Sequence, residues 1–342
     1  MMPERTPVRV CGLGSGTGLP VPHRQWAREA DSKGIPGNMV GIGISMGLLA
    51  AVVPIAGVSS PHLGPSPTLN APVSPRVILA SVAAPAGSAV DAVLAFDIDP
   101  HWHIYYDGEN DSGQPPTISA LSLPEGVTLG PIRWATPRRQ LLAGDILDST
   151  YEKRVELPFS VAIGAKTKPG EYSGTLNLSW MECTDVCQFG RAEASWTLRV
   201  LPAGAQAEPS AESKAVASAI DALPKVWTPE LAKTLKETLT IAAEISSTQG
   251  RLVVRAPKAQ GIEYHARAGS VKLADAVKDG ASKTDTLDAL LVLGDNERVD
   301  PKAAVSGIVV VINERGVRQG YEVHFPVAKK PESAPRDAGP KK

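Results

Sequence analysis

The chain has 342 residues, enough for two domains that each bury a hydrophobic core. Its 35 basic and 36 acidic residues nearly balance, which argues against a nucleic-acid-binding surface and against an acidic tail. With 31 glycines, 30 prolines and only 5% aromatic residues, the composition is typical of short strands joined by many turns.

The N-terminal region predicts export. Residues 1–38 are rich in Gly, Pro and Arg without periodicity, which indicates a disordered extension or a start codon assigned too early. Residues 39–60 include a run of about nineteen uncharged residues, long enough to cross a bilayer. This segment is a signal peptide if translation starts at Met39, and an uncleaved inner-membrane anchor otherwise. Either way, we expect the rest of the chain to be periplasmic or otherwise exported.

The first folded region is expected at residues 76–202, after a Pro/Ser-rich linker at 61–75. Its segments alternate apolar and polar residues, as in "SGTLNLSW", where Leu176, Leu178 and Trp180 share one face. A period of two is the mark of half-buried strands. Numerous short strands with turn residues between them predict an all-β, immunoglobulin-like sandwich.

A second small β-rich domain is expected at residues 220–328, after a linker with a short helix at 203–219. It begins with a helical segment for which Thr228 is the expected N-cap. Apolar segments such as "ALLVLG", "GIVVVIN" and "YEVHFPVA" then predict strands. The charged, Pro-rich tail at 329–342 is expected to be disordered. This second domain contains no cysteine, and we expect it to serve docking or spacing.

Two of the three cysteines lie close together, in "SWMECTDVCQFG". Cys11 precedes the export segment, which leaves Cys183 and Cys187 between a strand that ends near Trp180 and another that begins near Arg191. Cross-strand neighbours are close enough for a disulfide. Loop-closure entropy for so short a ring is only about 2 kcal/mol, so a stapling role is weakly favoured. A short, strained ring suits a bond that is made and broken.

The charges beside the cysteines indicate which role the pair has in exchange. The carboxylates of Glu182 and Asp185 do not lower the pKa of a thiol. The pair is therefore expected to receive attack by a partner thiolate rather than to act as a strongly activated nucleophile.

Two other interpretations of this region stay open. One is a non-catalytic binding module that is held by a permanent structural disulfide. The other is a copper-handling protein, in which Met181, the cysteines and the pair His101 and His103 supply soft ligands. Two histidines two apart on one strand share a face, although such a pair is more often a polar strand face. The spacing matches no zinc finger, so no metal and no cofactor is predicted, and no phosphate loop or serine-nucleophile motif is present.

The sequence around these residues resembles a known family. "DPHWHIYYDGENDSGQPPTISALSLPEGVTLGPIRWATPRR", "YEKRVELPFSVAI" and "LSWMECTDVCQFG" are similar to the N-terminal periplasmic domain of the thiol:disulfide interchange protein DsbD. The similarity is closer to the ScsB-like (suppressor of copper sensitivity) relatives, and it covers roughly residues 76–202. Residues 220–328 more weakly resemble the second β-domain of those relatives. The matching positions include Trp102, His103, Asp111–Pro116, Leu123–Val127, Trp134, Pro137, Tyr151, Leu157, Pro158 and Trp180.

This resemblance implies thiol–disulfide exchange without a cofactor. Electrons would come from a thioredoxin-like protein or a DsbD-type membrane electron donor. They would pass to periplasmic client proteins, in disulfide reduction or cytochrome c maturation. If it is redox active, the chain is a thiol:disulfide interchange protein of the protein-disulfide reductase type.

Residue roles follow from the same resemblance. Cys183 and Cys187 would be the redox pair, with Cys187 as the attacked residue. His103, Tyr105, Tyr151 and Trp180 would lie near the pair. A cap loop within "QLLAGDILDST" would shield it, and its expected residues are Leu142, Asp145 and Ile146.

The chain also departs from the family pattern. The family commonly has a proline soon after the second cysteine, where this chain has Gln188, Phe189 and Gly190. The expected cap loop lacks the aromatic residue found in the family, and Leu142 and Ile146 are expected to take the place of that residue. The sequence contains neither a C-x-x-C motif nor the electron-transporting membrane and thioredoxin domains of the full-length family members. We therefore expect separate partner proteins to supply and receive the electrons.

Overall fold

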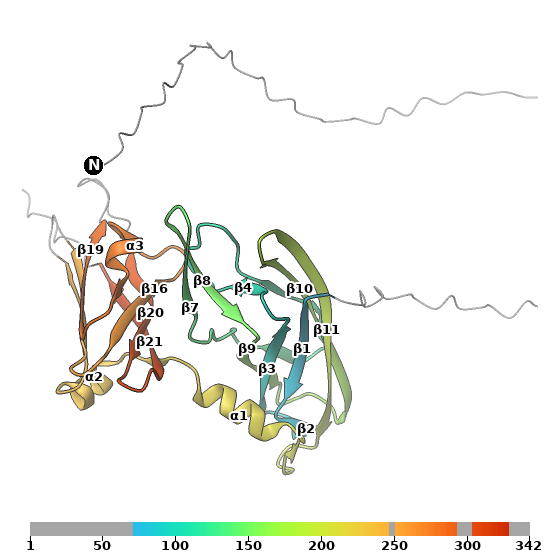
Figure 1. Ribbon diagram of the computed structural model, residues 1–342. Coiled ribbons are helices and arrows are strands. Elements are labelled where there is room, and N and C mark those ends of the chain that lie inside the picture. The colour runs from blue at the N-terminus through green and yellow to red at the C-terminus, as the bar shows by residue number, and fades with distance from the viewer. Residues whose placement is uncertain (1–70, 246–249, 293–302, 328–342) are drawn as a thin grey trace, which may run out of the picture. The chain divides into compact units, whose positions relative to one another are not determined.

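The computed structural model describes residues 71–245, 250–292 and 303–327 (Figure 1). The predictions for residues 1–38, for the export segment 39–60, for most of the linker 61–75 and for the tail 329–342 lie outside these residues. Within the described residues, no helix is long and apolar enough to cross a membrane.

Two sheets form the first β-sandwich, and their strands run mostly antiparallel. The smaller sheet has the order β1 (Val73–Leu79), β3 (Ala89–Ile98), β9 (Arg154–Ile163) and β6 (Val127–Leu129). The larger sheet has the order β12 (Glu208–Pro209), β2 (Ser81–Pro85), β11 (Cys187–Leu201), β10 (Gly170–Cys183), β4 (His103–Tyr105), β8 (Ile146–Glu152) and β7 (Arg138–Leu142), and β5 (Thr117–Ser122) also pairs with β10.

The core of this sandwich lies between the two sheets. Leu176, Leu178 and Trp180 of β10 are buried, and the residues between them are more exposed, as their alternation predicts. Phe96 of β3 packs edge-on against Trp180, with ring centroids 5.6 Å apart, and so joins the sheets. The all-β, sandwich-type fold predicted from the sequence is confirmed.

The β10–β11 hairpin continues further than expected. Its pairing runs without a break from Gly170↔Val200 to Cys183↔Cys187, so the strands do not stop near Trp180 and Arg191. Trp180 pairs with Gly190, and a Cβ atom at Gly190 would lie only 2.2 Å from the indole ring. The missing side chain lets the indole lie against the opposite strand, and pairing continues to the cysteines.

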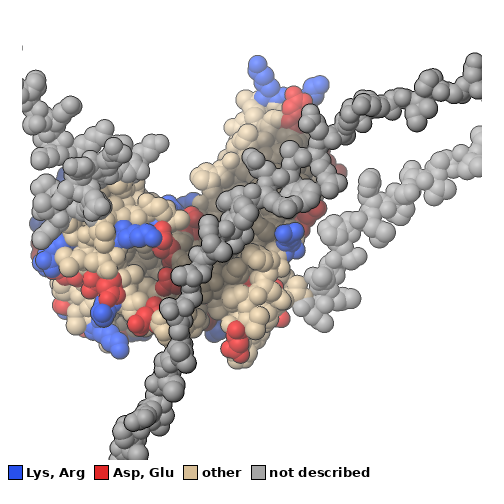
Figure 2. Space-filling model, turned by 90° about the horizontal axis from the view of Figure 1, so that it is seen from above, with Lys and Arg blue, Asp and Glu red and all other residues tan. Residues whose placement is uncertain are grey.

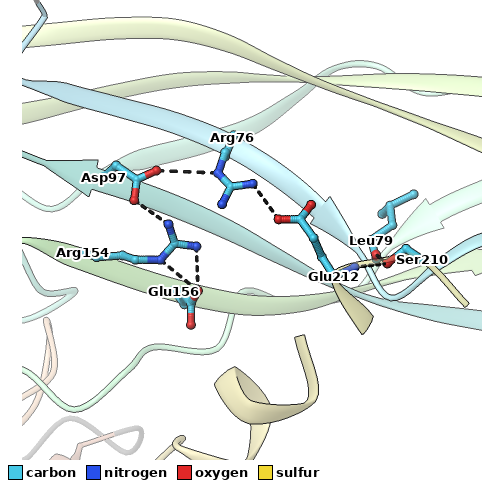
Figure 3. Close-up of polar contacts among 7 residues, drawn as sticks. All are labelled: Arg76, Leu79, Asp97, Arg154, Glu156, Ser210 and Glu212. Atoms are coloured by element: carbon cyan, nitrogen blue, oxygen red, sulfur yellow. Dashed lines mark hydrogen bonds and ion pairs between the residues drawn. The ribbon is translucent and has the colours of Figure 1, made fainter. Parts of the chain in front are cut away.

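A helix covers the outer face of the smaller sheet. Val216 and Ala219 of α1 (Ser213–Asp221) are buried against Ile78, Val93 and Ala95. Figure 3 shows the polar contacts beside this helix. Among them, the Ser210 hydroxyl donates to the carbonyl of Leu79 over 2.6 Å. The same hydroxyl oxygen accepts a hydrogen bond from the Glu212 amide over 3.2 Å. The remaining contacts form an ion-pair chain through Glu212, Arg76, Asp97, Arg154 and Glu156.

Residues 220–327 form the second β-rich region in two sheets. One has the order β13 (Lys225–Val226), β21 (Arg318–Pro326), β20 (Ala304–Ile312), β16 (Gly261–Ala266) and β18 (Ala281–Ser282). The other has the order β14 (Thr240–Ile245), β15 (Gly250–Arg255), β19 (Thr286–Val292) and β17 (Lys272–Leu273). Two short helices, α2 (Pro229–Leu235) and α3 (Ala276–Asp279), complete it. The predicted cap of α2 is present, because Thr228 Oγ1 accepts a hydrogen bond from the Leu231 amide over 3.2 Å.

The described residues of the two β-rich regions belong to one compact unit. Ile308 and Val310 of β20 pack into the hydrophobic core of the first sandwich. The hydroxyl of Ser149 on β8 lies 2.8 Å from Nδ1 of His265 on β16. On the face of the molecule in Figure 2, basic and acidic side chains are interspersed, as the nearly balanced charge suggests.

Candidate redox site

The Cys183–Cys187 disulfide closes the end of the β10–β11 hairpin. The two cysteines form the last cross-strand pair, with Cα atoms 4.1 Å apart. Their surroundings differ sharply, because Cys183 is 1% exposed whereas Cys187 lies in an exposed stretch of β11. A partner thiolate can therefore reach Cys187 more easily than Cys183.

Tyr105 supplies a hydrogen bond to the buried sulfur. Strand β4 pairs with the end of β10 so that His103 lies opposite Cys183. The Tyr105 hydroxyl donates to Cys183 Sγ over 3.0 Å and lies 3.9 Å from Cys187 Sγ. Tyr105 is fully buried, and burial raises the pKa of its hydroxyl above the usual value. The hydroxyl therefore stays protonated at neutral pH and remains a donor.

His103 supports Tyr105 from the side. Its Nε2 atom lies 3.3 Å from the Tyr105 oxygen, and the two rings pack edge-on with centroids 5.3 Å apart. Burial lowers the pKa of His103 below 6.5, and the charges of Asp148 and Glu152 oppose this effect only in part. The imidazole is therefore neutral at neutral pH.

Ser112 and Asp148, neither of which was an expected site residue, extend this set of contacts. Ser112 Oγ lies 3.2 Å from the Tyr105 oxygen and donates to Asp148 Oδ2 over 2.5 Å. The Ser112 amide also donates to Asp148 Oδ1 over 3.0 Å, so one carboxylate holds both groups. Asp148 is fully buried on β8. A polar residue at a buried strand position was the available signal, but its partner could not be identified from the chain order.

Glu182 helps to hold the hairpin and does not contact the sulfurs through a hydrogen bond. It is 3% exposed and accepts hydrogen bonds from Trp180 Nε1 over 2.6 Å and from Gln188 Nε2 over 2.8 Å. These contacts tie the core tryptophan of β10 to β11 beside the disulfide. Both donors are neutral, so Glu182 acts as a buried acceptor within the hairpin.

Tyr151, another expected site residue, lies in the core beside the site. It pairs with Ile104 across β8 and β4, and its hydroxyl donates to the carbonyl of Ala135 over 2.7 Å. Its ring packs edge-on against Tyr106, with centroids 6.5 Å apart. Tyr151 therefore supports the strand that carries His103 and Tyr105 rather than contacting the sulfurs through a hydrogen bond.

The expected cap-loop residues form the tip of the β7–β8 hairpin. Leu142 pairs with Ile146, and Asp145 has a positive φ of 59° in the turn between them. In the described part of the chain, no hydrogen bond or ion pair joins these three residues to either cysteine. Their role as a cap therefore stays a prediction.

The histidine pair is not arranged as expected. His101 is exposed and has a positive φ of 73°, and it precedes β4, whereas His103 is buried within that strand. The expectation that both lie on one strand face is wrong, because the turn ends only at His103. Within residues 71–245, 250–292 and 303–327, no three His, Cys, Asp or Glu side chains are grouped as a metal site would require.

Exposed apolar side chains flank the reachable cysteine. Val186 in the turn is 73% exposed, and Phe189, two residues after Cys187, is 67% exposed. Large apolar side chains beside a reactive group are typical of a surface that binds another protein.

Comparison with known protein families gives a match over part of the chain. Residues 71–197 match the model of "Thiol:disulfide interchange protein DsbD, N-terminal". Among solved structures, the N-terminal periplasmic domain of ScsB from Proteus mirabilis is similar, at 16% identity and a TM-score of 0.46, covering 76% of this chain and 95% of that one. A family 123 glycoside hydrolase from Clostridium perfringens matches at 11% identity and a TM-score of 0.22, over 39% of this chain and 27% of that one. No curated protein matches the chain.

Proposed function

Because residues 71–197 form a domain of the DsbD N-terminal type, we propose that the chain exchanges its Cys183–Cys187 disulfide with a thioredoxin-like partner. The observation that carries this proposal is the asymmetry of the bond. An exposed Cys187 is joined to a buried Cys183 whose sulfur accepts a hydrogen bond from Tyr105. One sulfur is open to attack, and the other has a donor ready for the charge that forms on it.

The exchange proceeds in two displacements. A partner thiolate attacks Cys187 Sγ, the bond to Cys183 breaks, and Cys183 leaves with the electron pair. A charge-assisted hydrogen bond from Tyr105 stabilises that leaving thiolate more strongly than it stabilises the disulfide sulfur. The second partner thiol then attacks the partner's own sulfur in the mixed disulfide and releases Cys187. The partner leaves oxidised, and this chain carries two electrons.

The reduced pair then passes its electrons to a client disulfide by the reverse steps. We propose that clients and partner dock on the apolar surface at Val186 and Phe189. The tip of the β7–β8 hairpin, with Leu142 and Ile146, limits access by other thiols. The proposed setting is outside the cytosol, after export directed by residues 39–60. Disulfide reduction and cytochrome c maturation are the two proposed uses of the electrons.

A redox titration of the full chain tests this proposal. The chain is equilibrated in glutathione and dithiothreitol buffers, and Cys183 and Cys187 are followed separately from Cys11 by alkylation and peptide mass spectrometry. A midpoint between roughly −180 and −270 mV, the range of working exchange proteins, is expected. A bond that stays closed below about −300 mV is a structural staple, and the chain is then a binding module instead.

A further inference from the structure

Reduction of the disulfide creates a proton-supply problem at Cys183. The residue is 1% exposed, and burial disfavours a charged thiolate. A thiolate released there needs a proton, and it has little direct contact with water. Glu182, its neighbour in the chain, is already occupied as an acceptor by Trp180 and Gln188. Some other group therefore has to connect the sulfur with the solvent.

A chain of close contacts makes that connection. The Tyr105 hydroxyl lies 3.0 Å from Cys183 Sγ, and Ser112 Oγ lies 3.2 Å from the Tyr105 oxygen. Tyr105 is fully buried, whereas Ser112 belongs to an exposed stretch of the loop before β5. The contacts thus run from a buried sulfur to the hydroxyl of an exposed residue. Asp148 accepts hydrogen bonds from both the hydroxyl and the amide of Ser112, which fixes this last link.

We propose that Ser112, held by Asp148, relays protons between water and Cys183 through the Tyr105 hydroxyl; this rests on the exchange reaction proposed above. As the disulfide breaks, the electron pair goes to the Cys183 sulfur, which takes the Tyr105 proton. The Ser112 hydroxyl turns from Asp148 to the Tyr105 oxygen and gives it the proton, and water at the exposed Ser112 returns one to the serine oxygen, which donates to Asp148 again. The sum is one proton from water on the Cys183 thiol. When a client is reduced, the proton leaves by the same route.

Asp148 and His103 are positioning residues in this scheme. The Ser112 amide donates to Asp148 Oδ1 and holds the serine in place, while its hydroxyl donates to Asp148 Oδ2 at rest and turns to the Tyr105 oxygen, 3.2 Å away, during the transfer. His103 Nε2 lies 3.3 Å from the same oxygen and also restrains the position of the Tyr105 hydroxyl. Neither side chain is hydrogen-bonded to a cysteine sulfur within the described residues.

The test is the rate of reduction by dithiothreitol, measured on the full chain by rapid acid quench, alkylation and mass spectrometry. Ser112→Ala is expected to slow reduction about a hundredfold and to change the difference in rate between H2O and D2O, while the midpoint potential stays unchanged. Ser112→Thr, which keeps a hydroxyl, is expected to restore both. Tyr105→Phe is expected to slow the reaction at least as much as Ser112→Ala.

Ser149→Ala is the matched control, because Ser149 adjoins Asp148 but its hydroxyl contacts His265. It is expected to leave the reduction rate and its isotope effect unchanged. An unchanged rate and isotope effect in Ser112→Ala overturns the relay, and so does equal slowing in Ser112→Ala and Ser149→Ala. Dithiothreitol needs no natural partner, so this result is separate from the redox titration. A normal midpoint with an unaffected Ser112→Ala variant removes the relay and leaves the exchange function standing.

Discussion

Two buried histidines, one in each β-rich region, show how similar parts lead to different chemistry. His103 is 6% exposed and contacts Tyr105, and His265 is 2% exposed and contacts Glu263. In each case the histidine and its contact lie two residues apart on the same strand. Burial is also the largest influence on both imidazoles, and it lowers both pKa values.

The polar contacts around each histidine form a cluster, and the two clusters differ in whether they include a reactive group. His265 contacts Ser149 through Nδ1 and Glu263 through Nε2, and Arg318 pairs with Glu263 over 2.7 Å, so this cluster is closed. The contacts of His103 lead through Tyr105 to a disulfide sulfur. A closed cluster of ionic and polar groups contributes stability and alignment, whereas an open one beside a reactive bond can stabilise a changing charge. Burial of a histidine is therefore not by itself a sign of function.

The largest expected effect is on thiol–disulfide exchange, and it differs between the two cysteines. Cys187→Ser is expected to abolish exchange, because it removes the exposed sulfur that a partner attacks. Cys183→Ser keeps that exposed thiol. It is expected to form a stable mixed disulfide with a thioredoxin-like protein that has a single active-site cysteine, supplied as its mixed disulfide with glutathione, because glutathione leaves and neither protein has a second thiol to release the other. Non-reducing electrophoresis with such a protein measures both. Mixed disulfides formed by Cys187→Ser and not by Cys183→Ser would reverse the assignment.

The closed cluster is expected to matter for stability rather than exchange. Glu263→Ala leaves Arg318 and His265 without their partner, and we expect a loss of about 3 kcal/mol in the free energy of unfolding. Urea denaturation measures this loss. The redox midpoint of the cysteine pair is expected to stay unchanged in the same variant. A shifted midpoint would mean that the two clusters are coupled.

Acid is expected to weaken the same cluster. The hydrogen bonds and charges of His265 and Arg318 outweigh the effect of burial and lower the pKa of Glu263 to about 2. The folded state therefore binds fewer protons than the unfolded state, so this stabilisation is complete above pH 4.5 and is lost as the pH falls towards 2. Glu263→Gln is expected to flatten the pH dependence of unfolding in that window. An unchanged slope in urea titrations would contradict the lowered pKa.

The open cluster is expected to show the reverse pattern. His103→Phe keeps a ring beside Tyr105 but removes the 3.3 Å contact to its oxygen. We expect a loss of only about 1 kcal/mol in stability, with reduction by dithiothreitol slowed severalfold. Urea denaturation measures the free energy of unfolding, and acid-quenched reduction by dithiothreitol measures the rate, so the two effects are separated. A large stability loss with normal reduction would place His103 in the same class as His265.

The smallest effect is expected on the outer face of the first sandwich. Arg76 pairs with Asp97 over 3.6 Å and with Glu212 over 2.9 Å, and its side chain is 47% exposed. Exposed ion pairs contribute little, so Arg76→Ala is expected to cost about 0.5 kcal/mol or less, and less still at high salt. Thermal melts at two salt concentrations check this. A cost near that of Glu263→Ala would show that α1 depends on the ion-pair chain.

Local patterns in the sequence were enough to predict several features. Alternation in β10 predicts which of its residues are buried, because strand geometry alone sends successive side chains to opposite faces. Thr228 before Pro229 predicts the start of α2, because capping acts over three residues. The spacing of Cys183 and Cys187 predicts a hairpin disulfide, because both residues lie on adjacent strand ends.

The tertiary structure alone decided how the site is built. Asp148 and Ser112 are 36 residues apart, and Tyr105 and Cys183 are 78 apart, so their contacts depend on how four separate segments meet. The spacing of His101 and His103 predicts a shared strand face, but His101 lies in the turn before the strand, with a positive φ. The unequal exposure of the two cysteines likewise depends on β4 covering only one side of the hairpin end. Strand periodicity and capping act within one segment, whereas burial and hydrogen-bond partners are set by packing between segments.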